Sequence, residues 1–236
     1  IAPNLPDIEI TKPTTRYTID ETADMTPADE HIVKPNHSEW PLVFMTVLTQ
    51  ISFGGFATAV LGESANFFGF NLPTPNFAMM AIIFLLSAIA LPLSALHLGK
   101  PLKALSAMKN IKTSWLSKEA LWLGVYTLGS FLVALLYFFE FGQFFRFLVE
   151  IATFGAGAYG IYAQSMIYRI KARPSWNKKE TTNIFFNVGY IGVLLVGAIL
   201  IANKDYQSAF IVVPFGAFIG FLQYSIFKEE VFFYTN

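Results

Sequence analysis

From Trp40 onward, long apolar runs alternate with short polar gaps. A helix needs about 20 apolar residues to cross the hydrocarbon core of a bilayer. We expect six membrane-spanning helices, at residues 41–62, 76–97, 118–140, 143–168, 181–203 and 207–227. No run alternates apolar and polar residues as a barrel strand would, and in lipid only helices and closed barrels satisfy the backbone. The pattern predicts an all-α fold, a polytopic membrane helical bundle.

Residues 1–40 are a different kind of sequence. They hold five prolines, and eight acidic residues against three basic ones. Because proline fixes φ and favours extended geometry in the residue before it, we expect an extended acidic arm without a core of its own. Two interpretations of the arm stay open, a disordered leader and a segment that lies on a partner. A membrane-spanning domain is expected to follow at residues 41–236.

The composition agrees with a membrane protein and excludes several other classes. Of the 236 residues, 54% are hydrophobic and 14% are charged, against about 25% charged in an average soluble domain. The 16 basic and 16 acidic residues balance, so no overall basic field would attract nucleic acid. The chain has no Cys, which excludes an iron–sulfur cluster held by this chain alone.

Basic residues gather in one set of connections between the expected spans. That set carries Lys100, Lys103, Lys109, Lys112, Lys118, Arg169, Lys171, Arg173, Lys178 and Lys179. The opposite set carries only Arg146 and Lys204. The positive-inside rule places the basic connections, and the arm with them, in the cytoplasm. Docking of an acidic partner on the other side of the membrane would produce the same asymmetry.

The histidines are too few for a haem or a metal site. His31 and His37 lie in the arm, and His97 closes the second expected span. A membrane haem held by two histidines needs a pair at matching depth on different helices, and zinc also needs several such ligands. We therefore expect neither haem nor a bound metal in this chain.

His97 and Glu119 are the strongest candidates for chemistry. One closes the second span and the other opens the third, so a helical hairpin returns both to the same membrane surface. A neutral histidine and a carboxylate there can handle protons. In the alternative, His97 reaches the headgroups and Glu119 lies in the first turn of its helix, stabilised by the dipole. We expect Glu63, Glu140 and Glu150 to be solvated residues at headgroup level.

Four short motifs occur in an order that resembles one family. They are Ser-Glu-Trp-Pro-Leu at 38–42, Leu-His-Leu-Gly-Lys-Pro at 96–101, Thr-Ser-Trp-Leu-Ser-Lys-Glu at 113–119 and Pro-Ser-Trp at 174–176. Together they resemble the dimethyl sulfoxide reductase membrane-anchor family, which includes polysulfide reductase-like membrane subunits. The resemblance covers about residues 40–180 and fades beyond that range.

The resemblance implies a multi-pass subunit of the bacterial cytoplasmic membrane that serves anaerobic respiration. Such a subunit is not the catalytic one: it binds and oxidises menaquinol and passes electrons to a ferredoxin-like iron–sulfur subunit. The [4Fe-4S] clusters and the molybdopterin are expected in partner subunits. Members of the family hold these partners on the external side of the cytoplasmic membrane, which conflicts with the cytoplasmic orientation of the basic connections that the positive-inside rule favours.

The resemblance also assigns site residues. The family's quinol-site histidine falls on His97 and its essential acid on Glu119, with the quinol expected between the second and third spans. Gly99 matches the glycine that follows the histidine. Lys103 stands where an arginine is usual, which keeps the charge but loses the planar fork.

Tyr168 and Arg169 lie near the same expected surface. They are weaker candidates for contacts with the quinol ring or a lipid headgroup, and a purely structural role is the alternative for both. The arm, at residues 3–6 and 11–16, looks like the C-terminal tail of the family's iron–sulfur subunit. This likeness implies an iron–sulfur domain fused upstream of Ile1.

Two functions of other classes stay open. In the first, the chain is a secondary transporter whose coupling acid is Glu140 or Glu150. Transporters favour internal repeats and helices broken at the midplane, and no clear repeat occurs in this sequence. In the second, the chain is a purely structural anchor with no quinone site. Substitution of His97 would then leave activity unchanged.

Overall fold

The computed structural model describes residues 40–67, 69, 74–96, 110–170 and 176–235. Its helices are α2 (Trp40–Phe67), α3 (Phe77–Leu96), α4 (Trp115–Phe138), α5 (Gln143–Tyr168), α6 (Lys179–Asn187), α7 (Tyr190–Ala202) and α8 (Tyr206–Thr235). No strand occurs in these ranges, so the expected all-α fold is confirmed. The chain divides into the units Ile1–Ser38 and Glu39–Asn236, and the expected arm lies outside the described residues.

The apolar helices correspond to the six expected spans. Five segments are long and apolar enough to cross a membrane: Trp40–Asn66, Trp115–Phe138, Gln143–Tyr168, Lys179–Ala202 and Tyr206–Ile226. Phe77–Leu93 is a shorter apolar helix. The fifth expected span differs from the expectation because it consists of two helices, α6 and α7.

Many large apolar side chains lie on the outside of the bundle. Leu128 is 71% exposed, Phe144 77% and Phe210 82%. An apolar surface of this extent would cause aggregation in water, whereas lipid tails cover it without cost. The exposed surface and the apolar helices together make this chain a multi-pass membrane protein.

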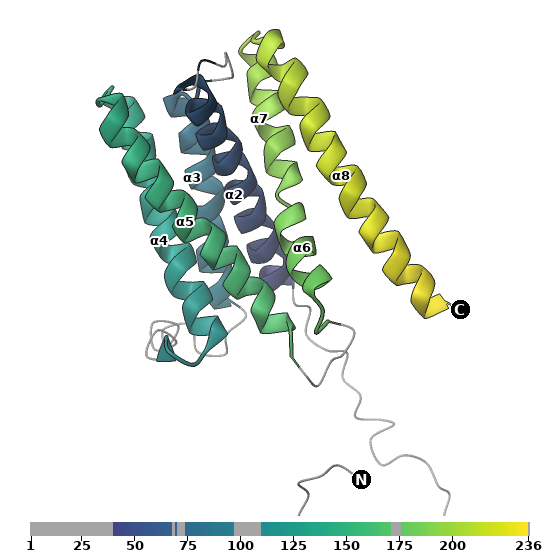
Figure 1. The fold of residues 1–236 in the computed structure, drawn as a ribbon. Helices are drawn as coiled ribbons and strands as arrows, with labels where there is room; N and C mark the ends of the chain where they lie inside the picture. The colour runs from purple at the N-terminus through teal and green to yellow at the C-terminus, as the bar shows by residue number, and fades with distance from the viewer. Residues whose placement is uncertain (1–39, 68, 70–73, 97–109, 171–175, 236) are drawn as a thin grey trace, which may run out of the picture. The chain divides into compact units, whose positions relative to one another are not determined.

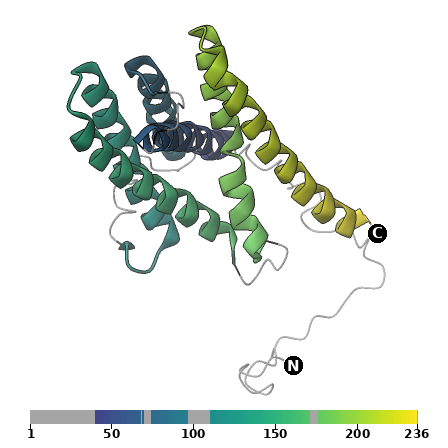
Figure 2. The ribbon, with the colours of Figure 1, turned by 45° about the horizontal axis from the view of Figure 1, so that its top comes forward.

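Helix α2 occupies the middle of the bundle. It contacts α3, α5, α6 and α7, while α4 packs on α3 and α5, and α8 packs on α6 and α7. Figures 1 and 2 show α4 and α5 on one side of α2, and α7 and α8 on the other. The apolar core includes Phe56, Met80, Ile83, Tyr126 and Ile161, which are all fully buried. Polar side chains on α2 therefore face several helices at once.

Helices α2 and α7 cross at glycines. A Cβ at Gly54 would lie 1.9 Å from the carbonyl oxygen of Gly189, and a Cβ at Gly192 would lie 2.0 Å from that of Ile51. Small residues allow such backbone contact between membrane helices. The turn between α6 and α7 lies at the same place, since the Gly189 N–H donates to the Phe186 carbonyl at 3.0 Å. The break in the fifth span is thus located at its crossing with α2.

Candidate functional site

Helix α4 begins at Trp115 rather than at residue 118. Ser114 caps it, because the Ser114 hydroxyl accepts a hydrogen bond from the Ser117 N–H at 3.3 Å. Glu119 consequently lies beyond the first turn of the helix, and its side chain is buried, with 4% exposure. The alternative that placed Glu119 in the first turn of its helix, stabilised by the dipole, is wrong, because the helix starts earlier than its apolar run.

Glu119 belongs to a chain of buried polar side chains from three helices. Gln164 on α5 donates through Nε2 to Glu119 Oε1 at 2.9 Å. The Oε1 atom of Gln164 accepts from Nε2 of Gln50 on α2 at 3.2 Å. The Nε2 atom of Gln164 also lies 3.4 Å from the Thr49 hydroxyl. We call Glu119, Gln164, Gln50 and Thr49 the glutamine chain.

The glutamine chain links α2, α4 and α5 at one level of the bundle. All four of its side chains are buried. An unpaired polar group in such surroundings costs about 1–3 kcal/mol, and the glutamine chain avoids that cost because each member has a partner. The same bonds fix the position of the Glu119 carboxylate. Glu119 is therefore held in place, buried among side chains of α2 and α5.

A pocket of about 320 Å³ adjoins the glutamine chain, between α2, the end of α5, and α6. Its lining is Val43, Thr46, Val47, Gln50, Tyr168, Trp176, Ile184, Phe185 and Val188. We call this the α2/α6 pocket. Apolar and aromatic walls with one or two polar groups are typical of sites for small molecules. Because Gln50 belongs to both the wall and the glutamine chain, two amide side chains connect the pocket with Glu119.

The structure gives Tyr168 and Arg169 different places. Tyr168 lines the α2/α6 pocket, and its ring lies 5.7 Å from the Trp176 ring and 5.2 Å from the Phe185 ring, centroid to centroid. Arg169 instead donates through Nη1 to the hydroxyl of Thr182 on α6 at 3.1 Å. Of the two, Tyr168 is positioned to touch an occupant of the pocket, and Arg169 joins the end of α5 to α6.

The other expected site residues, His97, Gly99 and Lys103, lie outside the described residues. The pairing of His97 with Glu119 therefore stays a prediction. The polar partner that the structure gives Glu119 is Gln164, and the sequence offered one signal for it. A glutamine within an apolar span is costly unless it is paired, so Gln50 and Gln164 were detectable as exceptions in their spans.

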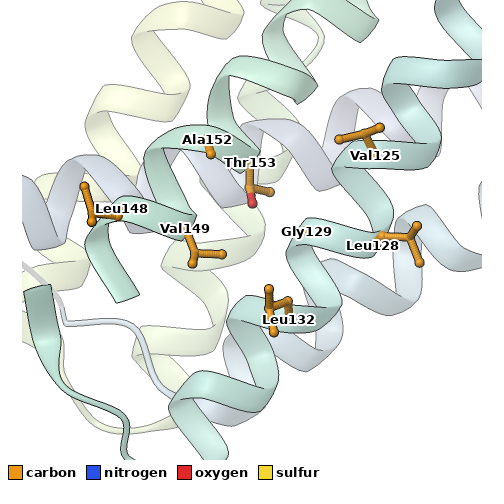
Figure 3. Close-up of a pocket in the computed structure, with 8 residues that line it drawn as sticks. All are labelled: Val125, Leu128, Gly129, Leu132, Leu148, Val149, Ala152 and Thr153. Carbon is orange, nitrogen blue, oxygen red and sulfur yellow. The ribbon is translucent and has the colours of Figure 1, made fainter. Parts of the chain in front are cut away.

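A second pocket lies between α4 and α5 and has a different character. Its volume is about 460 Å³. Figure 3 shows apolar side chains around it, among them Leu128, Leu132 and Leu148, with the hydroxyl of Thr153 as the polar exception. The leucines are exposed on the outside of the bundle. Because no set of polar groups converges in its lining, we assign this groove to the lipid-facing surface and not to a binding site.

The structure corrects the expectation for two of the three other acids. Glu63 and Glu150 are buried, with 4% and 0% exposure, and are not solvated at headgroup level. Glu140 is exposed in the turn between α4 and α5, as expected. The physical reason is a polar cluster that compensates for burial: Arg146 pairs with Glu63 through Nη2 and Oε1 at 2.6 Å, and Tyr137 contacts both carboxyl groups.

Comparison with known proteins identifies relatives of this chain. Residues 34–229 match the family model described as DMSO reductase anchor subunit (DmsC). The protein is 32% identical over 180 residues to the C subunit of anaerobic dimethyl sulfoxide reductase from Haemophilus influenzae, covering 72% of its own length and 62% of that protein. It is 29% identical over 178 residues to the YnfH subunit of anaerobic dimethyl sulfoxide reductase from Escherichia coli, covering 70% and 56%. No solved structure gives a significant match.

The matched ranges show how much of this chain and of its relatives the similarity covers. The family match extends to residue 229, past the region near residue 180 where the motifs fade. The chain spans about three fifths of the length of the curated relatives it matches. Because the family match covers most of the chain, the chain belongs to the DMSO reductase anchor subunit family.

Proposed function

We propose that this chain anchors a molybdopterin oxidoreductase complex in the bacterial cytoplasmic membrane, oxidises menaquinol and passes the electrons to an iron–sulfur subunit. Membership of the anchor family supports the first part. One observation carries the second part: Gln50 lines the α2/α6 pocket and also belongs to the glutamine chain that ends at Glu119. The α2/α6 pocket supplies an apolar binding site for a quinol ring, and we place the quinol there instead of between the second and third spans. The glutamine chain positions Glu119 as a proton acceptor.

Oxidation of a quinol releases two protons and two electrons. In this proposal, His97 accepts the proton of a quinol hydroxyl, and Glu119 with water passes it to the aqueous side before His97 accepts the second proton. Gln50 and Gln164 hold the Glu119 carboxylate in a fixed orientation, and Gln50 presents its amide to the pocket. Tyr168 contacts the quinol ring from the opposite wall. The electrons leave to an iron–sulfur cluster of the partner, which we place at the surface of the basic connections.

Filling the α2/α6 pocket tests the proposal. Val47→Trp places a bulky ring in the pocket wall, where it should displace the quinol. Because the quinol would lose several favourable contacts, we expect quinol-dependent turnover of the assembled complex to fall at least about tenfold. The measurement compares turnover driven by a menaquinol analogue with turnover driven by an artificial electron donor that acts directly on the catalytic subunit. The artificial-donor rate should not change.

A matched control exists on the outer surface. Val125→Trp introduces the same side chain into the lipid-facing groove between α4 and α5, and it should leave both rates unchanged. A purely structural anchor predicts that both variants behave alike with the quinol analogue. Equal quinol rates in the Val47→Trp and Val125→Trp proteins would therefore reject the quinol site at this pocket.

A further inference from the structure

A second buried polar cluster lies far from Glu119. It consists of Glu63 on α2, Tyr137 on α4, and Arg146 and Glu150 on α5, and we call it the carboxyl cluster. Glu119 and Tyr137 are both on α4, so their separation along the helix axis is about 27 Å at 1.5 Å per residue. This distance is close to the thickness of a bilayer core. The carboxyl cluster is therefore near the membrane surface opposite Glu119, and it takes no part in the proposed quinol chemistry.

The contacts within the carboxyl cluster are unequal. Arg146 Nη2 donates to Glu63 Oε1 at 2.6 Å, and the guanidinium lies 4.2 Å from the centroid of the Tyr137 ring. The Tyr137 hydroxyl contacts Glu63 Oε2 and also lies 3.0 Å from Glu150 Oε1. Glu150 is fully buried, and its Oε2 atom has no hydrogen-bond partner among the described residues. The nearest approach of Arg146 to Glu150 is 3.9 Å, from Nε to Oε1.

A count of hydrogens shows that the carboxyl cluster needs an additional proton. A tyrosine hydroxyl has one hydrogen, yet the Tyr137 oxygen is within hydrogen-bonding distance of a carboxyl oxygen from each glutamate. If both carboxyl groups were ionised, one of these contacts would join two oxygens with no hydrogen between them. Two carboxylates would also leave one uncompensated negative charge beside a single guanidinium in a buried place. One proton on a carboxyl group removes both difficulties.

The contacts also indicate which carboxyl group carries the proton. Both oxygens of Glu63 are contacted by donors, one by Arg146 and one by Tyr137. Glu150 has one oxygen without a partner among the described residues and only the longer approach of Arg146. Leaving a buried oxygen without a hydrogen-bond partner costs less free energy when it belongs to a neutral carboxylic acid than when it belongs to a carboxylate. On this count, Glu63 would be the anion of the ion pair, and Glu150 would donate to the Tyr137 oxygen, whose own hydrogen would go to Glu63.

The neighbouring helices, as far as the structure describes them, supply no other charge for Glu150. Helix α3, which packs on α2 and α4, has no titratable side chain in its described part. Tyr190 of α7 packs near Gly220 of α8, and Tyr126 of α4 bonds with Ser52. The other charged groups of α4 and α5 lie at the opposite end of these helices: Lys118 and Glu119 near the start of α4, and Arg169 directly after α5. Those of α6, Lys179 and Glu180, lie in its first turn. Glu140 lies exposed in the adjoining turn.

We propose that Glu63, Tyr137, Arg146 and Glu150 form a buried proton-binding site that holds one proton, on Glu150, at the end of the bundle opposite Glu119. The partial exposure of Arg146, at 18%, connects the site with the membrane surface. The site stands on the geometry of α2, α4 and α5 alone, so it does not depend on the proposed oxidation of quinol.

Infrared spectra of the full chain in lipid nanodiscs at neutral pH test this assignment. A protonated carboxylic acid has a carbonyl band that shifts in heavy water and is separate from the bands of carboxylates and amides. Glu150→Gln should remove one such band, because glutamine keeps the shape and the contact with Tyr137 but has no acid proton. Glu140→Gln changes an exposed carboxylate in the adjacent turn and should leave the band intact. An identical band in wild type and Glu150→Gln overturns the proposal.

Two further variants test the proton count independently of Glu150→Gln. In Glu63→Gln, the carboxyl group that remains beside Arg146 is that of Glu150, which should then be ionised, so the band should also disappear. In Arg146→Gln, both buried carboxyl groups should be protonated, so the intensity should rise about twofold, from one acid to two. An unchanged band in both variants contradicts the site even if Glu150→Gln fails to assemble.

Discussion

Replacing Glu119 by glutamine is expected to lower quinol-dependent turnover by at least about a hundredfold, which is the usual contribution of a general acid or base. Glutamine preserves the size of the side chain, and its oxygen still accepts from Gln164, so the packing of α2, α4 and α5 should persist. The substitution removes only the ability to accept a proton. The measurement is the initial rate of the assembled complex with a menaquinol analogue.

Two comparisons make this result specific. The rate with an artificial donor should equal that of wild type, because that route does not use the anchor. Glu140→Gln removes an exposed carboxylate from the turn between α4 and α5, and its quinol-dependent rate should be normal. If Glu119→Gln oxidised the quinol analogue as fast as wild type, Glu119 would have only a structural role.

The glycine crossing of α2 and α7 is expected to tolerate no side chain. In Gly192→Ala, the new Cβ would lie 2.0 Å from the Ile51 carbonyl oxygen and 2.4 Å from the Gly55 nitrogen. These are backbone atoms, so the conflict can be relieved only if the helices separate. We expect a loss of about 3 kcal/mol in the free energy of unfolding, at the upper end for overpacked sites. Thermal unfolding of the purified chain in detergent provides the measurement.

Glycines of other helices serve as matched controls. A Cβ added at Gly124 of α4 or at Gly155 of α5 meets nothing within 4 Å. Alanine is favoured over glycine inside a helix by roughly 0.5–1 kcal/mol, so Gly124→Ala and Gly155→Ala should leave stability unchanged or slightly raised. A Gly192→Ala protein as stable as these two controls would show that α2 and α7 are further apart than the structure has them.

The sequence predicted the spans well because their signal is local. Length and hydropathy of each run are enough to locate a helix that crosses a membrane. The interruption between α6 and α7 cannot be located from length and hydropathy alone. It lies where the backbone of Gly189 meets Gly54, which is distant in sequence. The sequence offers only a change of composition there, since the residues before the break include Thr181, Thr182, Asn183 and Asn187 and those after it are apolar.

Only the part of the candidate site that has a local signal in the sequence was predictable. Glu119 stands out as an acid at the start of an apolar run, whereas its partners Gln164 and Gln50 become visible only when three helices are placed together. The expectation that Glu63 and Glu150 are solvated was wrong because it considered each residue alone. The spacing of Arg146 and Glu150, four residues apart on one helix, was the available sign of a paired group.

The binding of a fluorescent quinol-analogue inhibitor to the purified complex is the most direct test of a quinol site in this protein. Titration of the wild-type complex should quench the fluorescence with a saturable, single-site curve. Val47→Trp, which fills the α2/α6 pocket, and His97→Arg should both abolish the saturable component, while Val125→Trp on the lipid-facing groove should keep it. Equal single-site quenching in the wild type, Val47→Trp and His97→Arg complexes would place the quinol outside the α2/α6 pocket and contradict the proposed function.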